Sequence, residues 1–143
     1  MRIVALETTE RAGSVAALQG ADVLAEIELD PEQRSAQSLA PALQQLLADV
    51  GWKPAEIELV IVAQGPGSFT GLRVGVTTAK TLAYVAKAAL VGVDSLEVIA
   101  RQDPQSSQRI TAVMDAQRQE LFVHRFRCSS GWVEPLGEAE ILS

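Results

Sequence analysis

The sequence predicts an α/β domain in which helices pack on a mixed sheet. Three strand-like runs open the chain, and a helix–strand–helix–strand pattern follows them. A glycine-rich loop at 64–75 (QGPGSFTGLRVG) comes directly after an apolar run. The 143 residues are 48% apolar and 21% charged, a composition typical of a globular domain with a sizeable core.

The first three runs predict an antiparallel meander. Residues 2–7 (RIVALE) are a short apolar run typical of a buried strand. Residues 14–19 and 23–29 are two more runs, and the QGAD stretch between them indicates a hairpin turn. Pro31 closes this section.

The middle of the chain alternates helix and strand patterns. Leu39 and Leu43 begin a helical repeat over about 36–50, and Gly51 is a natural stop for that helix. Residues 57–63 (IELVIVA) hardly alternate, so we expect a strand buried on both faces. The elements expected next are a helix at about 70–87, a strand at 89–93 and a short helix that Ser95 would cap and that ends near Arg101.

The last part of the chain predicts a hairpin. A polar loop at 103–108 leads into strand-like runs at 109–115 and 120–127, with a turn at 116–119. The remainder, to Ser143, is too short for a domain of its own.

The glycine loop is not a standard phosphate loop. From Gly65 to Gly71 it is one residue too long for a Walker-type loop, and Leu72 follows where that loop has lysine. The spacing also fails the dinucleotide fingerprint. A hydroxyl at the helix start could still cap the helix and attract an anion, and polar side chains end the first strand. The possible nucleotide-loop residues are therefore Glu7, Thr8, Ser68 and Thr70.

The glycines also form a stripe, because Gly67, Gly71 and Gly75 recur every four residues. A glycine within a helix costs about 0.5–1 kcal/mol relative to alanine, which indicates a close contact at that face. One alternative is packing of the helix on the chain's own sheet. The other, which we favour, is an interface between helices of two subunits. The residues predicted for that interface are Gly67, Gly71, Gly75, Leu72, Ala79, Leu82, Leu39 and Leu43.

The composition excludes several classes of site. The formal net charge is −6 and no basic run is present, which disfavours nucleic-acid binding by the chain alone. His124 is the one histidine and Cys128 the one cysteine, so a zinc site of the usual ligands is not expected. The absence of a ~20-residue apolar run and of disulfide pairs favours a cytoplasmic protein without a membrane span.

Residues 65–75 (GPGSFTGLRVG) resemble the signature of the TsaB family, the glycoprotease-like proteins of tRNA threonylcarbamoyladenosine biosynthesis. Three further stretches, 3–9 (IVALETT), 14–16 (SVA) and 113–118 (VMDAQR), follow in the family's order. The resemblance covers essentially residues 1–127. It departs at Glu7, where the family has aspartate, and at Ser35, where it has histidine; family members are also longer.

The resemblance implies an actin-like (ASKHA, ribonuclease H-like) fold, with 1–102 as its first domain and 103–143 as the start of a second half that is mostly absent. It also implies a non-catalytic scaffold that pairs with a TsaD-like catalytic subunit or with itself and works with a TsaE-like ATPase. Such a scaffold would meet tRNA only within the complex. No cofactor is expected by itself, although ATP or ADP and a metal ion fit the complex. The alternatives are an actin-like ATPase or sugar kinase and a metallopeptidase (glycopeptidase).

We predict that the isolated chain does not bind tRNA with sub-micromolar affinity at physiological salt. Its net charge of −6 and lack of a basic run leave few cations to neutralise phosphates. A gel-shift titration with purified tRNA checks this. A tight complex that weakens steeply with added salt would contradict it.

Overall fold

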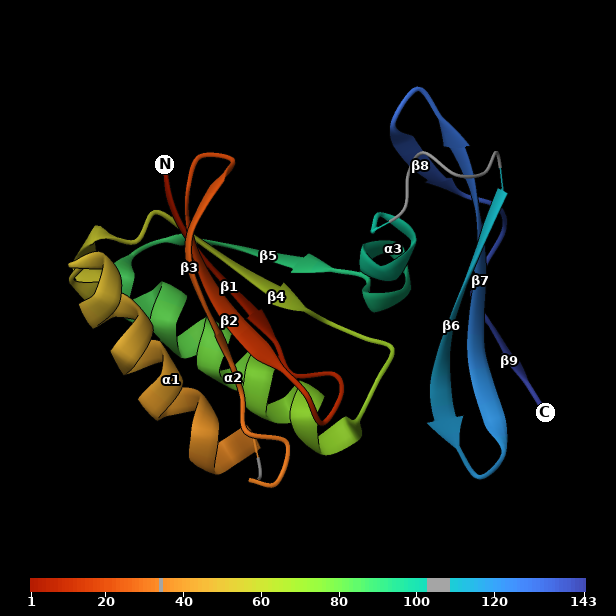
Figure 1. Cartoon of the computed structure of the whole chain (residues 1–143), viewed down its shortest axis with the longest axis horizontal. Helices are drawn as coiled ribbons and strands as arrows, with labels where there is room; N and C mark the ends of the chain where they lie inside the picture. The colour runs from red at the N-terminus through yellow and green to blue at the C-terminus, as the bar shows by residue number, and fades with distance from the viewer. Residues whose placement is uncertain (34, 103–108) are drawn as a thin grey trace. The chain divides into compact units, whose positions relative to one another are not determined.

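The computed structural model describes residues 1–33, 35–102 and 109–143, so the polar loop predicted at 103–108 lies outside the described residues. The chain forms two compact units (Figure 1), the first made of Met1–Gln64 and Ser68–Gly92 and the second of Gly65–Gly67 and Val93–Ser143. The division after Gly92 comes ten residues before the predicted boundary at 102. The reason is that helix α3 (Ser95–Ala100) packs Leu96 and Ala100 into the core of the second unit.

The first unit is built on a five-stranded sheet in the order β3-β2-β1-β4-β5. Its first three strands pair antiparallel, which confirms the predicted meander. Strand β4 instead lies parallel to β1, with Ile3 opposite Leu59, so the chain must cross over between them. The strands are β1 (Arg2–Glu7), β2 (Ser14–Gln19), β3 (Asp22–Glu28), β4 (Leu59–Ala63) and β5 (Ala89–Val93).

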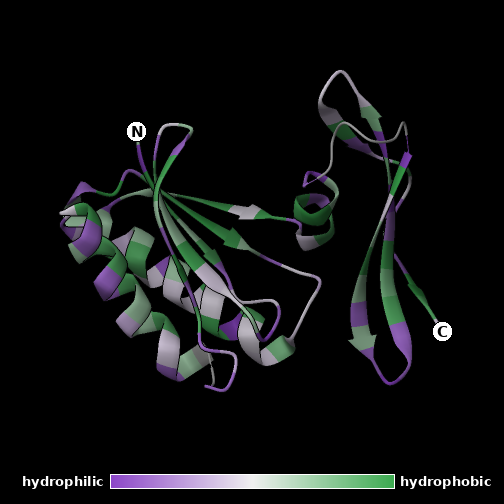
Figure 2. Cartoon of the chain, in the orientation of Figure 1, coloured by the Kyte–Doolittle hydropathy of each residue, from purple (hydrophilic) through white to green (hydrophobic). Residues whose placement is uncertain are grey.

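Two long helices, α1 (Ser35–Val50) and α2 (Phe69–Ala86), lie side by side on one face of this sheet (Figure 1). Val4 and Val60 point from neighbouring strands into the core beneath them, where Leu46 is also fully buried. Figure 2 shows the apolar character of these strands. The helical repeats predicted over 36–50 and 70–87 are therefore confirmed within a residue at each end.

The prediction that β4 is buried on both faces was wrong. Its helix-facing side chains Val60 and Val62 are buried, whereas Leu59 and Ile61 are half-buried. Strand β5 is exposed almost throughout, with Val91 45% exposed. Both strands are apolar runs in the sequence. Among the described residues, however, α1 and α2 pack on the same face of the sheet. An apolar run alone does not reveal which face of a strand is covered.

The second unit is a four-stranded sheet of order β6-β7-β8, with β9 paired to the other edge of β7. The predicted hairpin is confirmed, and both of its strands extend beyond the expected ends. Strands β8 and β9 were not predicted, because runs this short carry little periodicity. The bounds are β6 (Arg109–Gln117), β7 (Glu120–Ser129), β8 (Trp132–Pro135) and β9 (Glu140–Leu142).

Helix α3 covers one face of this sheet. Its Leu96 packs with Met114 and Phe126, and Phe126 is only 1% exposed. The cap is Asp94, whose side chain accepts a hydrogen bond from the Glu97 N–H at 2.9 Å, and not the predicted Ser95. No helix in the described ranges is long and apolar enough to cross a bilayer.

The short 3₁₀ helix η1 (Pro54–Glu56), which was not predicted, fastens the start of β1. The Glu56 carboxylate accepts hydrogen bonds from the Lys53 N–H, at 2.7 Å, and from the Arg2 guanidinium, which also lies over the Trp52 ring. The hydrogen bond from the Lys53 backbone, followed by that from Arg2, lowers the pKa of Glu56 below its ordinary value.

We predict that Glu56→Gln lowers the Tm at neutral pH and that the difference from wild type disappears in acid. A carboxylate whose folded pKa is lowered stabilises the fold above its unfolded pKa, near 4.5, and this contribution is lost as the pH falls through the folded pKa. Thermal unfolding across that window tests the prediction. Glu26→Gln, at an exposed position on β3, is the matched control and should show no such convergence. A pH-independent effect of Glu56→Gln would contradict the prediction.

Candidate functional site

The candidate site begins where the turn after β1 is bonded to the start of α2. The side chain of Thr8 is fully buried, and its hydroxyl donates a hydrogen bond to the carbonyl of Gly71 at 2.8 Å. One residue further, the carbonyl of Thr9 accepts a hydrogen bond from the Ser68 N–H at 2.7 Å. Segments about sixty residues apart in the sequence are thereby held together.

Two glycines of the stripe make this contact possible. A Cβ on Gly71 would lie 1.9 Å from the Thr8 carbonyl oxygen, and a Cβ on Gly75 would lie 2.1 Å from the Thr8 hydroxyl oxygen. Neither distance is compatible with a side chain. Gly71 and Gly75 are thus packed within the chain, against the turn after β1 rather than against the sheet itself, and this contact accounts for them without a second subunit.

The possible nucleotide-loop residues come together, but most of them are engaged internally. Glu7 accepts a hydrogen bond from the Thr9 N–H at 2.5 Å and another from the Thr9 hydroxyl. Ser68 caps α2 by accepting a hydrogen bond from the Gly71 N–H at 3.3 Å. Thr8 is occupied as described above. Of the four, Thr70 alone is exposed, and it lines a groove on the helix surface.

Several residues predicted for the interface lie inside the chain instead. Leu39, Leu43 and Ala79 are 1%, 8% and 0% exposed in the core of the first unit, so they offer a second subunit almost no surface. Leu72 and Leu82 are half-buried. The helical spacing located the apolar faces of both helices, but the chain's own sheet covers them.

The exposed surface of the helix pair carries a different set of residues. An open groove of about 400 Å³ lies between the start of α1, at Ala36, and α2, at Arg73 and Thr77. The Arg73 guanidinium lies over the ring of Phe69, which is 74% exposed. Near the other end of α2, Tyr84 is 86% exposed. Sequence reasoning missed Phe69; the signal was an aromatic residue at the helix start, off the buried glycine stripe.

The beginning of the glycine loop belongs to the second unit. The Gly65 carbonyl accepts a hydrogen bond from the Ser95 N–H at 2.8 Å. Gly65 has a φ of 114°, a conformation that favours glycine. Gly67, the remaining residue of the predicted glycine stripe, lies in this segment, outside helix α2.

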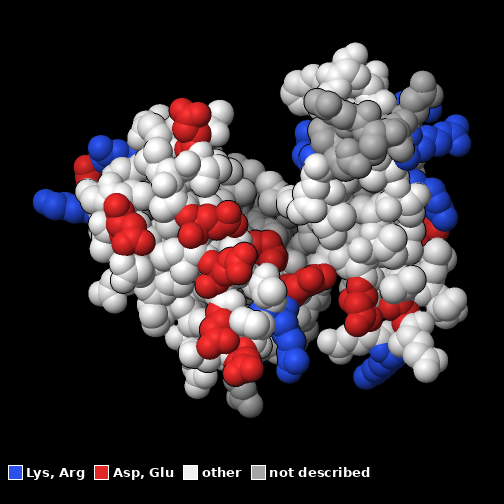
Figure 3. All heavy atoms as spheres, in the orientation of Figure 1, with Lys and Arg blue, Asp and Glu red and all other residues white. Residues whose placement is uncertain are grey.

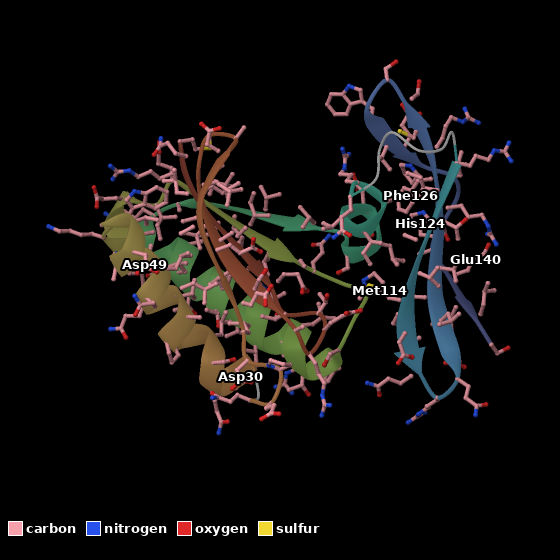
Figure 4. The ribbon with its side chains drawn as sticks, in the orientation of Figure 1. Asp30, Asp49, Met114, His124, Phe126 and Glu140 are labelled. Atoms are coloured by element: carbon pink, nitrogen blue, oxygen red, sulfur yellow. The ribbon has the colours of Figure 1, made fainter. Side chains whose placement is uncertain are left out.

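Neither His124 nor Asp115 belongs to a possible metal-binding cluster among the described residues. His124 (Figure 4) lies beside Phe126, and its Nε2 is 3.1 Å from the carbonyl of Gly137. Asp115 accepts a hydrogen bond from the Gln117 N–H in its own turn. Within the described ranges, no three His, Cys, Asp or Glu side chains gather closely enough to hold a metal ion.

Comparison with known proteins places the chain in a family. Residues 23–136 match the family model of TsaD, tRNA N6-adenosine threonylcarbamoyltransferase. The chain is 32% identical to the tRNA threonylcarbamoyladenosine biosynthesis protein TsaB of Bacillus subtilis (strain 168), over 94% of this chain and 58% of the relative. It is 34% identical to TsaB of Escherichia coli (strain K12), over 85% and 53%. The chain belongs to the TsaB family.

Solved structures agree with this assignment and confirm the actin-like, ribonuclease H-like fold. YeaZ from Pseudomonas aeruginosa superposes with a TM-score of 0.88 at 25% identity, over 99% of this chain and 67% of that one. A protein from the same organism described as similar to the peptidase YEAZ gives 0.87 at 26%, over 99% and 66%. The chain spans somewhat more than half the length of the TsaB relatives named above.

We predict that Gly75→Ala destabilises the fold and that Thr8→Ala partly rescues it. The added methyl group collides chiefly with the Thr8 hydroxyl, and after Thr8→Ala the nearest remaining side-chain atom is the Cβ of residue 8, at 3.3 Å. Overpacking of this kind costs about 1–3 kcal/mol, and contacting residues couple by about 0.5–3 kcal/mol. Denaturant unfolding of the two single variants and the double variant measures the coupling.

Lys80→Ala, on the exposed face of the same helix, is the matched control and should be additive with Thr8→Ala. Gly71→Ala is expected to be more severe than Gly75→Ala and not to be rescued, because its added carbon meets a backbone oxygen. Equal destabilisation of Gly75→Ala with and without Thr8 would refute the contact.

Proposed function

We propose that the chain is a non-catalytic scaffold subunit for threonylcarbamoyladenosine formation in tRNA. Its relatives are named for that pathway, which is the reason for choosing this substrate class. The observation that carries the non-catalytic part is the use of Glu7, Thr8 and Ser68 in bonds within the chain. An ATPase of this fold needs a carboxylate and hydroxyl groups that are free to meet magnesium and phosphate.

The partner proposed for this scaffold is a TsaD-like catalytic relative, or a second copy of the chain in isolation. The contact surface would be the exposed side of α1 and α2 around the groove. Exposed aromatic side chains such as Phe69 and Tyr84 are typical anchors of protein interfaces, and the arginine stacked on Phe69 belongs to the same class. This surface replaces the buried leucines as the predicted interface.

The rest of the complex follows from the same assignment. A TsaE-like ATPase would bring ATP and a metal ion, and tRNA would be bound by the assembled subunits. A cytoplasmic location fits a protein that works on tRNA.

We predict that Phe69→Glu and Tyr84→Glu weaken pairing with the TsaD-like subunit or with a second copy by about 30-fold or more. A charge in place of a central aromatic anchor removes a contact that is typically worth at least about 2 kcal/mol. Co-purification and light scattering on the same proteins measure it. Val23→Glu, at an exposed apolar position on β3, is the control and should pair as wild type does.

Normal pairing of both charged variants would exclude the α1–α2 surface. Hydrolysis of Mg-ATP by the purified chain alone would exclude the non-catalytic assignment and favour the actin-like ATPase alternative.

A further inference from the structure

An unusual pair of arginines lies in the second unit. Arg109 on β6 and Arg127 on β7 are directly opposite each other in the antiparallel register. Side chains at such positions are only about 4.5–5.5 Å apart at Cβ, and like charges there are destabilising. Both arginines are exposed, and neither guanidinium forms an ion pair or hydrogen bond within the described parts of the chain.

A neighbouring arginine on the same face is neutralised by a carboxylate. Arg125, two residues before Arg127, forms an ion pair with Glu140 at 3.2 Å. Glu134 lies opposite Arg127 on its other side but does not bond to it. Figure 3 shows basic side chains gathered along this part of the second unit. The whole chain has a net charge of −6, but no carboxylate among the described residues forms an ion pair with either of these two arginines.

The same two arginines line a pocket. It has a volume of about 610 Å³, and Cys128, Ser129 and Ser130 also line it. This volume lies within the usual range of small-molecule sites, about 300–1,000 Å³. The two serine hydroxyls add hydrogen-bond donors beside the guanidinium groups. Two arginines with hydroxyl donors suit a phosphate group, which guanidinium groups bind with paired hydrogen bonds.

An exposed aromatic ring stands next to the pocket. Trp132 is opposite Ser129 in the register and therefore on the same face as Ser129 and Arg127. It is 68% exposed, unusual for tryptophan outside a binding surface. An indole beside two arginines can stack a nucleobase while the arginines hold its phosphate.

We propose that the Arg109–Arg127 pocket binds the phosphate of a nucleotide, with the base stacked on Trp132. The nucleotide is either free or a unit of single-stranded RNA, since both present the same groups. A single pocket of this size gives weak binding, which agrees with the absence of tight tRNA binding expected for the chain alone. The site is distinct from the helix surface of the proposed scaffold function and does not depend on it.

The test is an NMR titration of the full chain that follows the arginine Nε–H and tryptophan Nε1–H signals. The probes are inorganic phosphate, adenosine monophosphate and a short oligoadenylate. We expect the nucleotide to shift the signals of Arg109, Arg127 and Trp132. Arg109→Gln and Arg127→Gln should each weaken binding about tenfold or more, the effect of losing one charge-assisted hydrogen bond. Arg118→Gln, at an exposed arginine in the β6–β7 turn, should bind as wild type does.

The probes also distinguish a free nucleotide from single-stranded RNA as the ligand. Tighter binding of the oligoadenylate than of the mononucleotide supports the site with RNA as its ligand, and equal or weaker binding supports it with a free nucleotide. Three results overturn the proposal: no shift with any probe, unchanged binding in both glutamine variants, or phosphate binding as tightly as the mononucleotide without moving the Trp132 signal.

Discussion

The burial of Thr8 between Gly71 and Gly75 is the contact on which the first unit depends. It joins the turn after β1 to the first two turns of α2 and so fixes where that helix begins on the sheet. A hydroxyl that donates to the Gly71 carbonyl can approach so closely only because no Cβ stands in the way. The spacing of four residues between these glycines reflects the helical repeat that presents both to one threonine.

This contact also decides how the glycine motif should be interpreted. Glycines at helical spacing indicate close approach, but the sequence does not say what approaches. The same ambiguity applied to Leu39 and Leu43. Their spacing identified an apolar helix face, but such a face is found both in protein cores and at subunit interfaces. In both cases the covering group, Thr8 or the chain's own strands, lies far away in the sequence. Tertiary contact, rather than periodicity, separates the two interpretations.

The features that could be predicted are those whose pattern is complete within a short stretch of sequence. Residues 2–7 and 14–19 were predicted to the residue because a strand's pattern is complete within six positions and a hairpin turn marks its end. Strand β9 has three residues and leaves no such pattern. The burial of β4 and the packing of α3 in the second unit depend on contacts between segments that are distant in sequence. Apolar runs that look alike in the sequence therefore differ in burial in the structure. The pairing of Arg109 with Arg127 likewise exists only once the register is known.

The side chains at the end of β1 show how polar residues of this fold are engaged within the chain itself. One carboxylate oxygen of Glu7 accepts hydrogen bonds from Thr9, and the Thr8 hydroxyl donates to the Gly71 carbonyl. A buried hydroxyl left without a partner costs about 1–3 kcal/mol, so freeing Thr8 for a ligand would carry that penalty in addition to loosening α2. Stability of the fold and availability of these groups to a nucleotide are therefore in direct competition. In this chain the bond that positions α2 occupies the Thr8 hydroxyl, and what remains exposed on that helix is the aromatic and polar surface for which we propose contact with another protein.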